Sequence, residues 1–363
     1  SPNHLGTNAG DFTRIQKENM SLPLLPIWQF DQKIYTAAET NTIATQVGEQ
    51  FASAMQSAQV TSDNWSNEPL AAALVETASV HCLAQLTATG WWGPSNQLPS
   101  TILWKIAGEW LQTGWLQTRA HEKPLGYAGD YALLEAIINE TCTSDPLGQI
   151  FDRFFLRQAA PAAVRHRTRL VARALATGCL NKKTSRYSVV SVGCGPGLDI
   201  RRGIEMLPEN FRQTLEVTLL DLDDESLDYA KESLRATMNP AQIHTYRENL
   251  SRLARKPQAR ALFKNPQLLV CTGFFDYLEK NTATELLRFF WDQLPTDGQL
   301  LVGNFMPSHP TRAYMEWIGN WYLTYRTPAE MEEMALNAGI PPDCQRIGTE
   351  PTGCNLFLQA RKA

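Results

Sequence analysis

The sequence predicts an α/β fold, in which a region made only of helices precedes a doubly wound, mostly parallel sheet. Two observations carry this prediction. From residue 187 onward, short β-branched and aliphatic runs alternate with segments whose apolar residues recur at helical spacing. Before residue 181, helical spacing dominates and few β-branched runs interrupt it. Alternating strands and helices are typical of a parallel sheet with helices on both faces.

The composition is that of a globular protein with a sizeable core. The chain has 363 residues, of which 43% are hydrophobic and 19% charged, and its net charge is -4. This length suggests one large domain or two. The negative charge and the lack of a Lys/Arg block disfavour nucleic acid as a partner. We expect no signal peptide, and no run of the about 18 apolar residues that a membrane span needs.

The seven cysteines are scattered along the chain and form no C-x-x-C pair. This pattern is typical of free thiols in a reducing compartment, and it argues against a zinc site or a disulfide framework. The sequence therefore predicts a cytoplasmic protein without a metal site.

Three regions are expected along the chain. Residues 1–25 are polar and are interpreted as a flexible arm. Residues 26–160 form a helical cap or substrate domain, with helices over Thr36–Ala58 and Leu70–Thr89. Residues 161–363 form the sheet domain.

The helical region is rich in tryptophan. Seven of the ten tryptophans fall there: Trp28, Trp65, Trp91, Trp92, Trp104, Trp110 and Trp115. In one interpretation, the indoles fill the core of a helical bundle. In the other, they wall a pocket over a ligand, where a cation held against the rings would gain about 1–2 kcal/mol.

The strands of the sheet domain are short, apolar and bounded by turn residues. They are expected at Tyr187–Val192, Leu215–Leu220, Ile243–Arg247, Gln267–Thr272, Gln299–Val302, Cys344–Ile347 and Asn355–Ala360. A helix is expected over Ala283–Leu294, and Thr327 with Glu330 forms a capping box that begins another helix.

The stretch Ser188–Asp199 is the most informative part of the sequence. A buried-strand pattern ends in glycines at 193, 195 and 197, and a helical pattern follows. Strand, glycine-rich turn and helix form the layout of a nucleotide-binding crevice. Glycine suits the turn because a Cβ would block close approach of a ligand, and because some turn residues need a positive φ. The spacing is not G-x-G-x-x-G, since residue 198 is a leucine.

With G-x-G-x-G followed two places on by Asp199, this stretch resembles motif I of the class I S-adenosylmethionine (SAM) methyltransferases. The resemblance implies a Rossmann-like, seven-stranded methyltransferase sheet with an antiparallel seventh strand, and SAM as the methyl donor. It also implies that Asp221, after the second strand, accepts hydrogen bonds from the ribose hydroxyls. Asp199 would reach the amino group of the methionine part.

The same resemblance assigns the other ligand contacts. Leu222 would flank the adenine, Asn249 and Leu250 would contact it, and residues 271–273 would line the methyl-transfer site. The expected SAM-binding set is Gly193, Cys194, Gly195, Gly197, Asp199, Asp221, Leu222, Asn249, Leu250, Cys271, Thr272 and Gly273. A helix cap is the alternative role for Asp221.

A more specific resemblance runs from about residue 122 to the C-terminus. Four segments, Leu125–Tyr131, Ala163–Arg167, Gly193–Gly197 and Thr272–Tyr277, are similar to those of a bacterial group of SAM-dependent enzymes. That group includes enzymes proposed to make the methyl ester of a 3-hydroxy fatty acid signal. Residues before 122 carry no such match, so the choice of substrate stays open.

Candidate catalytic residues come from two of these segments. Tyr127 and Tyr131 lie on a loop that opens a predicted helix, where Asp130 is either the helix cap or a site residue. Arg165 and His166 lie in a segment with arginines at 165, 167 and 169, which cannot all share one helical face. One arginine of this segment is expected to point at the site.

The reaction with SAM mainly needs alignment, because its methyl group is already activated for in-line displacement. A carboxylate acceptor needs only a cation to orient it, such as Arg165 or Arg326. An amine or a phenol needs a base, with His166 as the first candidate and His309 as the second. A surface histidine without a catalytic role is the alternative for His166.

The leading interpretation is a SAM-dependent transfer of a methyl group to a small molecule (a carboxylate, amine or hydroxyl) in bacterial specialised or signal metabolism. Two alternatives stay open. An aromatic-walled chamber could hold SAM folded so that its amino group attacks Cγ, giving azetidine-2-carboxylate and methylthioadenosine. The chain could instead be an inactive binding protein, against which the intact glycines and Asp221 argue. The expected partner is a small-molecule substrate, with neither nucleic acid nor membrane involved. A homodimer is one option, and the oligomeric state stays open.

Overall fold

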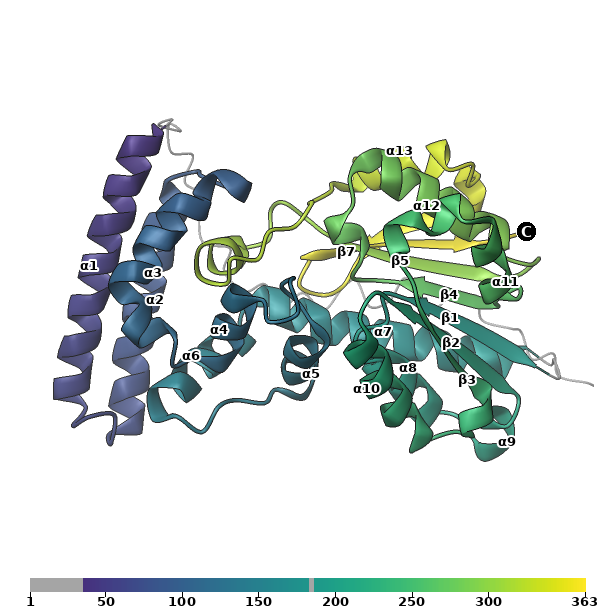
Figure 1. Ribbon diagram of the computed structural model, residues 1–363, viewed down its shortest axis with the longest axis horizontal. Coiled ribbons are helices and arrows are strands. Elements are labelled where there is room, and N and C mark those ends of the chain that lie inside the picture. The colour runs from purple at the N-terminus through teal and green to yellow at the C-terminus, as the bar shows by residue number, and fades with distance from the viewer. Residues whose placement is uncertain (1–34, 183–185) are drawn as a thin grey trace, which may run out of the picture. The chain divides into compact units, whose positions relative to one another are not determined.

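The computed structural model describes residues 35–182 and 186–363 (Figure 1). The predicted arm, residues 1–25, lies outside the described residues. Residues 35–363 form one compact unit. The predicted boundary between residues 160 and 161 falls inside α7 (Ala159–Asn181), and a domain division at that point stays a prediction.

Six α-helices lie between residue 35 and α7. They are α1 (Ala37–Thr61), α2 (Glu68–Ala88), α3 (Gln97–Leu111), α4 (Trp115–Glu122), α5 (Tyr131–Asn139) and α6 (Pro146–Leu156), with a short 3-10 turn at Gly93–Asn96. The first helix begins with a capping box, in which Thr36 and Glu39 each accept a hydrogen bond from the other's backbone N–H. α1 packs against both α2 and α3. The two long helices predicted at the start of this region are confirmed.

These helices share an apolar core with a later part of the chain. Phe51 and Phe151 are buried in it with their ring centroids 6.3 Å apart. Phe305, which ends the fifth strand, and Trp317 and Trp321, which follow that strand, are buried in the same core. The core over the helices is therefore built from two parts of the chain that are far apart in sequence.

Most described tryptophans of the helical region pack against this core, namely Trp65, Trp91, Trp92, Trp104 and Trp110, whereas Trp115 is exposed. Trp65 meets Trp110 edge to face with 6.1 Å between centroids, and Trp104 stacks on His121 at 3.9 Å. Residue 28 lies outside the described residues. These contacts support the interpretation that the indoles fill a helical core.

The sheet has seven strands in the order β3-β2-β1-β4-β5-β7-β6. They are β1 (Tyr187–Val192), β2 (Leu215–Asp221), β3 (Ile243–Arg247), β4 (Leu268–Cys271), β5 (Gln299–Phe305), β6 (Gln345–Thr349) and β7 (Asn355–Arg361). The first five strands run parallel, and β7 is antiparallel to both β5 and β6. The predicted seven-stranded sheet with an antiparallel last strand is confirmed. Because the strand order reverses between β1 and β4, a ligand is expected at the carboxyl ends of these strands.

Helices cover both faces of the sheet (Figure 1). Those after β1 are α8 (Leu198–Glu205), α9 (Glu209–Arg212), α10 (Asp224–Arg235), α11 (Arg260–Phe263), α12 (Lys280–Gln293) and α13 (Pro328–Asn337). Short 3-10 turns lie at Pro240–Gln242, Leu250–Arg255, Pro257–Ala259, Phe275–Tyr277 and Pro342–Cys344, and a π-helical turn lies at Tyr314–Ile318. Successive strand residues point to opposite faces. Val189 accordingly packs in one core with α7, α8 and α10, and Val190 packs in another with α12 and α13.

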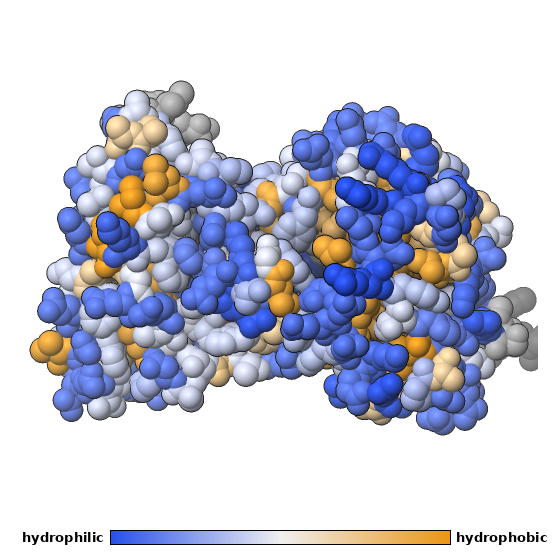
Figure 2. Space-filling view, in the orientation of Figure 1, coloured by the Kyte–Doolittle hydropathy of each residue, from blue (hydrophilic) through white to orange (hydrophobic). Residues whose placement is uncertain are grey.

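The second helix has an unusual composition. Within the described residues, α2 is the one helix with the length and the mean hydropathy, 1.3, of a membrane span, and 28% of that window is buried. This finding differs from the expectation that no stretch is apolar enough. It is weak evidence, because a helix in the core of a water-soluble protein meets the same test. On the face drawn in Figure 2, apolar residues appear in small groups among hydrophilic ones.

Candidate functional site

The glycine-rich turn after β1 has a backbone that side chains would not tolerate. Gly193, Gly195 and Gly197 have φ angles of +66°, +51° and +64°, a region that L-residues with a Cβ rarely adopt. A Cβ at Gly193 would lie 3.2 Å from Cβ of Phe274, and one at Gly197 would lie 3.0 Å from Cβ of Ala230. The turn is therefore bare backbone at the carboxyl end of a central strand, as the sequence predicted.

The carboxylate of Asp221 is held against this turn. Its Oδ2 accepts a hydrogen bond of 3.1 Å from the N–H of Gly195, and its Oδ1 accepts one of 3.2 Å from the N–H of Asp223. The residue is only 8% exposed, and burial raises the pKa of its carboxyl, while the N–H donors oppose the shift. A buried acid at the end of β2 keeps lone pairs for a ligand that can donate hydrogen bonds. It is not the cap of α10, because that role belongs to Asp223.

The other predicted SAM contacts lie around the same turn. Leu222 follows Asp221 and is 53% exposed, whereas Leu250 is buried with its Cδ1 3.6 Å from the position of a Cβ on Gly193. Asn249 begins the turn after β3 and accepts a hydrogen bond from the hydroxyl of Ser251. Four further residues belong to the predicted SAM-binding set. The thiol of Cys194 is buried near Asp221. Cys271 ends β4, and Thr272 and Gly273 follow it. Contact of each with a ligand stays a prediction.

Hydrogen bonds link the loop before α5 to the segment after β4, which in turn is hydrogen-bonded to the segment after β5. The hydroxyl of Tyr277 donates to the carbonyl of Ala128 at 3.0 Å, and Nε1 of Trp321 donates to that hydroxyl at 2.9 Å. Gly129 allows this contact, because a Cβ there would lie 2.5 Å from Cζ2 of Trp321 and its φ is +76°. The structure thus brings the loop predicted to carry catalytic residues to the carboxyl side of the sheet.

Two tyrosines of this loop were predicted to be catalytic. Burial raises the pKa of Tyr127, and the charges of Asp221 and Asp223 at the end of β2 raise it further. Tyr131 packs its ring on Tyr229 of α10 at 5.3 Å between centroids. Tyr127 therefore lies in the field of the candidate site, and a catalytic role for either tyrosine stays a prediction.

Asp130, next to these tyrosines, is the N-cap of α5. Its Oδ1 accepts hydrogen bonds of 2.9 Å from the N–H of Leu133 and from Nε of Arg119. The helix-cap interpretation is confirmed.

The three arginines at 165, 167 and 169 of α7 have different surroundings. Arg165 donates to the carbonyls of Leu156 and Ile137, which end α6 and lie in the last turn of α5, so its guanidinium ties helices together. Arg169 is exposed. Arg167 is 9% exposed and donates from Nη1 to the carbonyl of Thr272 at 3.1 Å. The arginine that faces the end of β4 is therefore Arg167 and not the predicted Arg165.

The histidines offered as bases occupy different surroundings. His166 is half-buried, and burial lowers its pKa, while the charge of Glu350 in the β6–β7 turn opposes the shift. His309 is 4% exposed, and neither ring nitrogen has a hydrogen-bond partner within the described residues. Burial, and then Arg312, lower the pKa of His309 to about 4, so it is neutral near pH 7. Its ring packs between Phe305 and Tyr325 after β5.

Arg326, the other cation proposed to orient a carboxylate, is buried, and its side chain makes three hydrogen bonds inside the protein. Its guanidinium donates to the carbonyls of Phe275 and Leu278 and to the side chain of Asn304. It therefore fixes the segment after β4, and a role in orienting an acceptor stays a prediction.

Sequence reasoning missed a second ionisable group at this edge. Asp276 is 2% exposed, and its Oδ1 accepts a hydrogen bond of 2.7 Å from the N–H of Phe305 at the end of β5. Burial raises the pKa of its carboxyl to about 7, although Arg167 and Arg326 act in the opposite direction. Its place five residues after β4, in the segment Thr272–Tyr277 that carries the specific resemblance, was the available signal.

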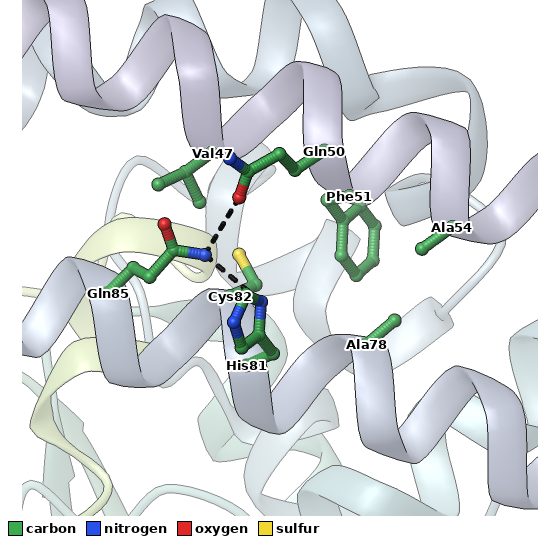
Figure 3. Close-up of a pocket in the computed structure, with 8 residues that line it drawn as sticks. All are labelled: Val47, Gln50, Phe51, Ala54, Ala78, His81, Cys82 and Gln85. Atoms are coloured by element: carbon green, nitrogen blue, oxygen red, sulfur yellow. Dashed lines mark hydrogen bonds between the residues drawn. The ribbon is translucent and has the colours of Figure 1, made fainter.

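Two hollows lie between α1 and α2 and take no part in this arrangement. The smaller has a volume of about 30 Å³, enough for a water molecule or two, and Gln85 donates there to Gln50 at 3.0 Å (Figure 3). The larger, of about 340 Å³, is lined by small residues such as Ala54 and Ala78. Neither contains a residue of the glycine turn, so we place the candidate site at the sheet edge, where the bare backbone and buried charges meet.

Comparison with known proteins gives a likeness of fold. No family model and no curated protein matches the chain. The structure of a possible exported protein from Bordetella parapertussis is similar over 90% of this chain and 97% of its own, with 18% identity and a TM-score of 0.52. The S-adenosylmethionine-dependent methyltransferase SibL in its apo form matches over 88% and 97%, with 15% identity and a TM-score of 0.44. Human N-acetylserotonin methyltransferase in complex with SAM matches over 81% and 70%, with 15% identity and a TM-score of 0.40.

Proposed function

We propose that this protein binds SAM at the carboxyl ends of β1, β2 and β4 and transfers its methyl group to a small-molecule acceptor. One observation carries the proposal. The N–H of Gly195, in a turn of three positive-φ glycines, donates to the buried carboxylate of Asp221 at the end of the next strand. Bare backbone beside an acceptor-only carboxylate suits a ribose, which approaches closely and donates from two hydroxyls.

The residues present fit the parts of SAM. Asp221 would hold the ribose hydroxyls, and the exposed side chain of Leu222 would cover one face of the adenine. Asp199 lies in the first turn of α8, partly buried, and would face the ammonium group of the methionine part. The missing Cβ atoms would meet protein side chains, such as Phe274 at Gly193 and Ala230 at Gly197, so the glycines let the turn pack closely on its neighbours.

When SAM is bound, its sulfonium supplies an already activated methyl carbon. The protein then has to align the acceptor and exclude water. The segments after β4 and β5 supply the groups for the acceptor side, since Asp276 and His309 are both buried there. His309 is neutral near pH 7, and neither of its ring nitrogens has a partner in the described part of the chain, so it can accept a hydrogen bond from a hydroxyl or an amine. Its low pKa makes it a weak base, and His166 stays the candidate base.

The acceptor class follows from the specific resemblance. We propose a small molecule of bacterial specialised or signal metabolism, with a 3-hydroxy fatty acid as the first to test, because four segments of this chain are similar to that group of enzymes. A cytoplasmic location is part of the proposal, supported by seven cysteines that are all free thiols.

The test is calorimetric titration of the purified protein with S-adenosylhomocysteine, followed by mass spectrometry of reactions that contain SAM with and without bacterial metabolites. Binding, together with S-adenosylhomocysteine that forms only when metabolites are present, supports the proposal. Methylthioadenosine that forms from SAM alone would replace methyl transfer by the cyclisation reaction. The absence of binding would leave a protein with the fold and without the activity.

A further inference from the structure

Arg167 is a buried cation whose charge no ion pair neutralises. Only 9% of its surface is exposed, and its one hydrogen bond within the described residues runs from Nη1 to the carbonyl of Thr272. No carboxylate oxygen of the described residues lies within the 4.0 Å that defines an ion pair. A guanidinium has five N–H donors, so most of its donors are uncommitted. Burying a charge without a partner is costly, and such groups are kept mainly where a ligand completes them.

The surroundings of Arg167 show where its free donors lie. A Cβ on Gly273, the second residue after β4, would lie 3.3 Å from Nη2 and 3.6 Å from Nη1, so the guanidinium covers bare backbone at this edge of the sheet. The two carboxylates that interact most strongly with its charge are Asp276 and Asp199. Asp199 in turn lies two residues after the last glycine of the turn. The cation thus stands between the glycine turn and the end of β4.

Neither carboxylate is positioned to neutralise Arg167 directly. Oδ1 of Asp199 accepts a hydrogen bond of 2.8 Å from the N–H of Ile200, and Oδ1 of Asp276 is held by the N–H of Phe305. A cation and a carboxylate that interact electrostatically without forming an ion pair, as Arg167 and Asp199 do, can together bind a zwitterion. The amino-acid end of SAM is such a zwitterion, with an ammonium and a carboxylate on one carbon.

We propose that Arg167 binds the carboxylate of the methionine part of SAM while Asp199 binds its ammonium group. The inference rests on the proposed function and adds to it the residue that binds the carboxylate end of SAM. Arginine suits this role because its planar fork can donate two parallel hydrogen bonds to a carboxylate. Arg167 is then a binding residue that also fixes the direction in which the methyl group points.

The test compares two ligands that differ in one group: SAM, and decarboxylated SAM, which lacks only the carboxylate. Calorimetry of the full chain is expected to show that the wild type binds SAM about 10- to 100-fold more tightly, the effect of a charge-assisted pair. In Arg167→Gln, the affinity for SAM should fall to that for decarboxylated SAM, whose own affinity should stay within about threefold of wild type. Arg169→Gln, an exposed arginine on the same helix, is the matched control and should keep the wild-type ratio.

Each outcome decides between the two claims. A wild-type ratio of affinities in Arg167→Gln would overturn the role of Arg167. If that variant fails to fold by circular dichroism, Arg167→Lys keeps the charge and loses the fork, so its ratio should fall to a few-fold, and an unchanged ratio overturns the inference. A wild type that binds neither ligand overturns the proposed function itself. A wild type that binds both ligands equally overturns only the inference.

Discussion

In the helical core, the large buried side chains are apolar, whereas at the carboxyl ends of β1, β2 and β4 several buried side chains are ionisable. Phe51 and Phe151 represent the first region. The second holds Asp221, Asp276 and Arg167, each less than 10% exposed. A buried apolar side chain stabilises the fold, while a buried charge costs free energy unless something compensates it. The comparison therefore indicates that the functional site lies at the sheet edge, because buried ionisable side chains there would not be selected for stability alone.

A buried acid in the helical region has a backbone donor on each of its oxygens, although burial still raises the pKa of its carboxyl. Asp152 accepts a hydrogen bond of 2.9 Å from the N–H of Leu116 on one oxygen and another of 2.9 Å from the N–H of Thr143 on the other. It therefore ties α6 to neighbouring segments of the chain. Arg167, by contrast, uses a single donor. The difference lies in how many polar atoms the protein itself satisfies.

The largest expected effect tests the helical side of the comparison. Phe151→Ala should lower the free energy of unfolding by about 3–5 kcal/mol, because it removes a fully buried ring and leaves a cavity. Urea unfolding measures the loss. The affinity for S-adenosylhomocysteine, measured in the absence of urea, should stay at the wild-type value. A large loss of affinity would mean that the helical core and the sheet edge are not separable in this way.

The next effect tests the sheet edge. Asp221→Ala should weaken binding of S-adenosylhomocysteine by about 100-fold, because charge-assisted hydrogen bonds to the ribose are lost. Its effect on stability should be small, since burial already disfavours the charged form. Calorimetry gives the affinity, and Asp224→Ala, an exposed acid on α10, is the control that should bind normally. Equal affinities in wild type and Asp221→Ala would remove Asp221 from the site.

The pH dependence of the unfolding free energy tests whether Asp276, at the sheet edge, is a buried acid with a raised pKa. Burial raises the pKa of this carboxyl from 3.8 to about 7, so the folded state binds its proton more tightly than the unfolded state. The resulting stabilisation is complete below about pH 3.8 and is lost as the pH rises through 7. Asp276→Asn keeps an acceptor for the N–H of Phe305 and cannot titrate. The difference in unfolding free energy between wild type and variant should therefore change between pH 4 and 7, and a constant difference would contradict the raised pKa.

The smallest effect comes from a surface feature that belongs to neither region. Thr327 caps α13 by accepting a hydrogen bond from the N–H of Glu330. Thr327→Ala should cost about 1 kcal/mol of stability. Thermal unfolding would show it as a small drop in Tm, and SAM affinity should not change. A change in affinity of more than about threefold would show that α13 positions the site.

Local patterns explain what could be predicted from the sequence. The strands and the glycine turn carry their own signals, because burial on both faces requires continuous apolar runs and positive φ requires glycine. Asp221 could be placed because it lies at the end of a strand. Each of these features depends on a few neighbouring residues.

The features that escaped prediction depend on packing between distant segments. The packing of α7 on β4 decides which arginine of residues 165, 167 and 169 faces the sheet edge. No local sequence pattern contains that information. The burial of Asp276 depends on the backbone of β5. The same holds for the segment 305–321, whose aromatic residues complete the helical core.

That shared core has a consequence for how the chain can be divided. Phe305, Trp317 and Trp321 find their apolar neighbours among helices encoded before residue 160. A recombinant fragment starting at residue 161 would present these rings to water, and it would also lose the N–H of Ala160 that now donates to Thr311. Such a fragment should aggregate, so the two halves of the gene are better exchanged between relatives together than one at a time.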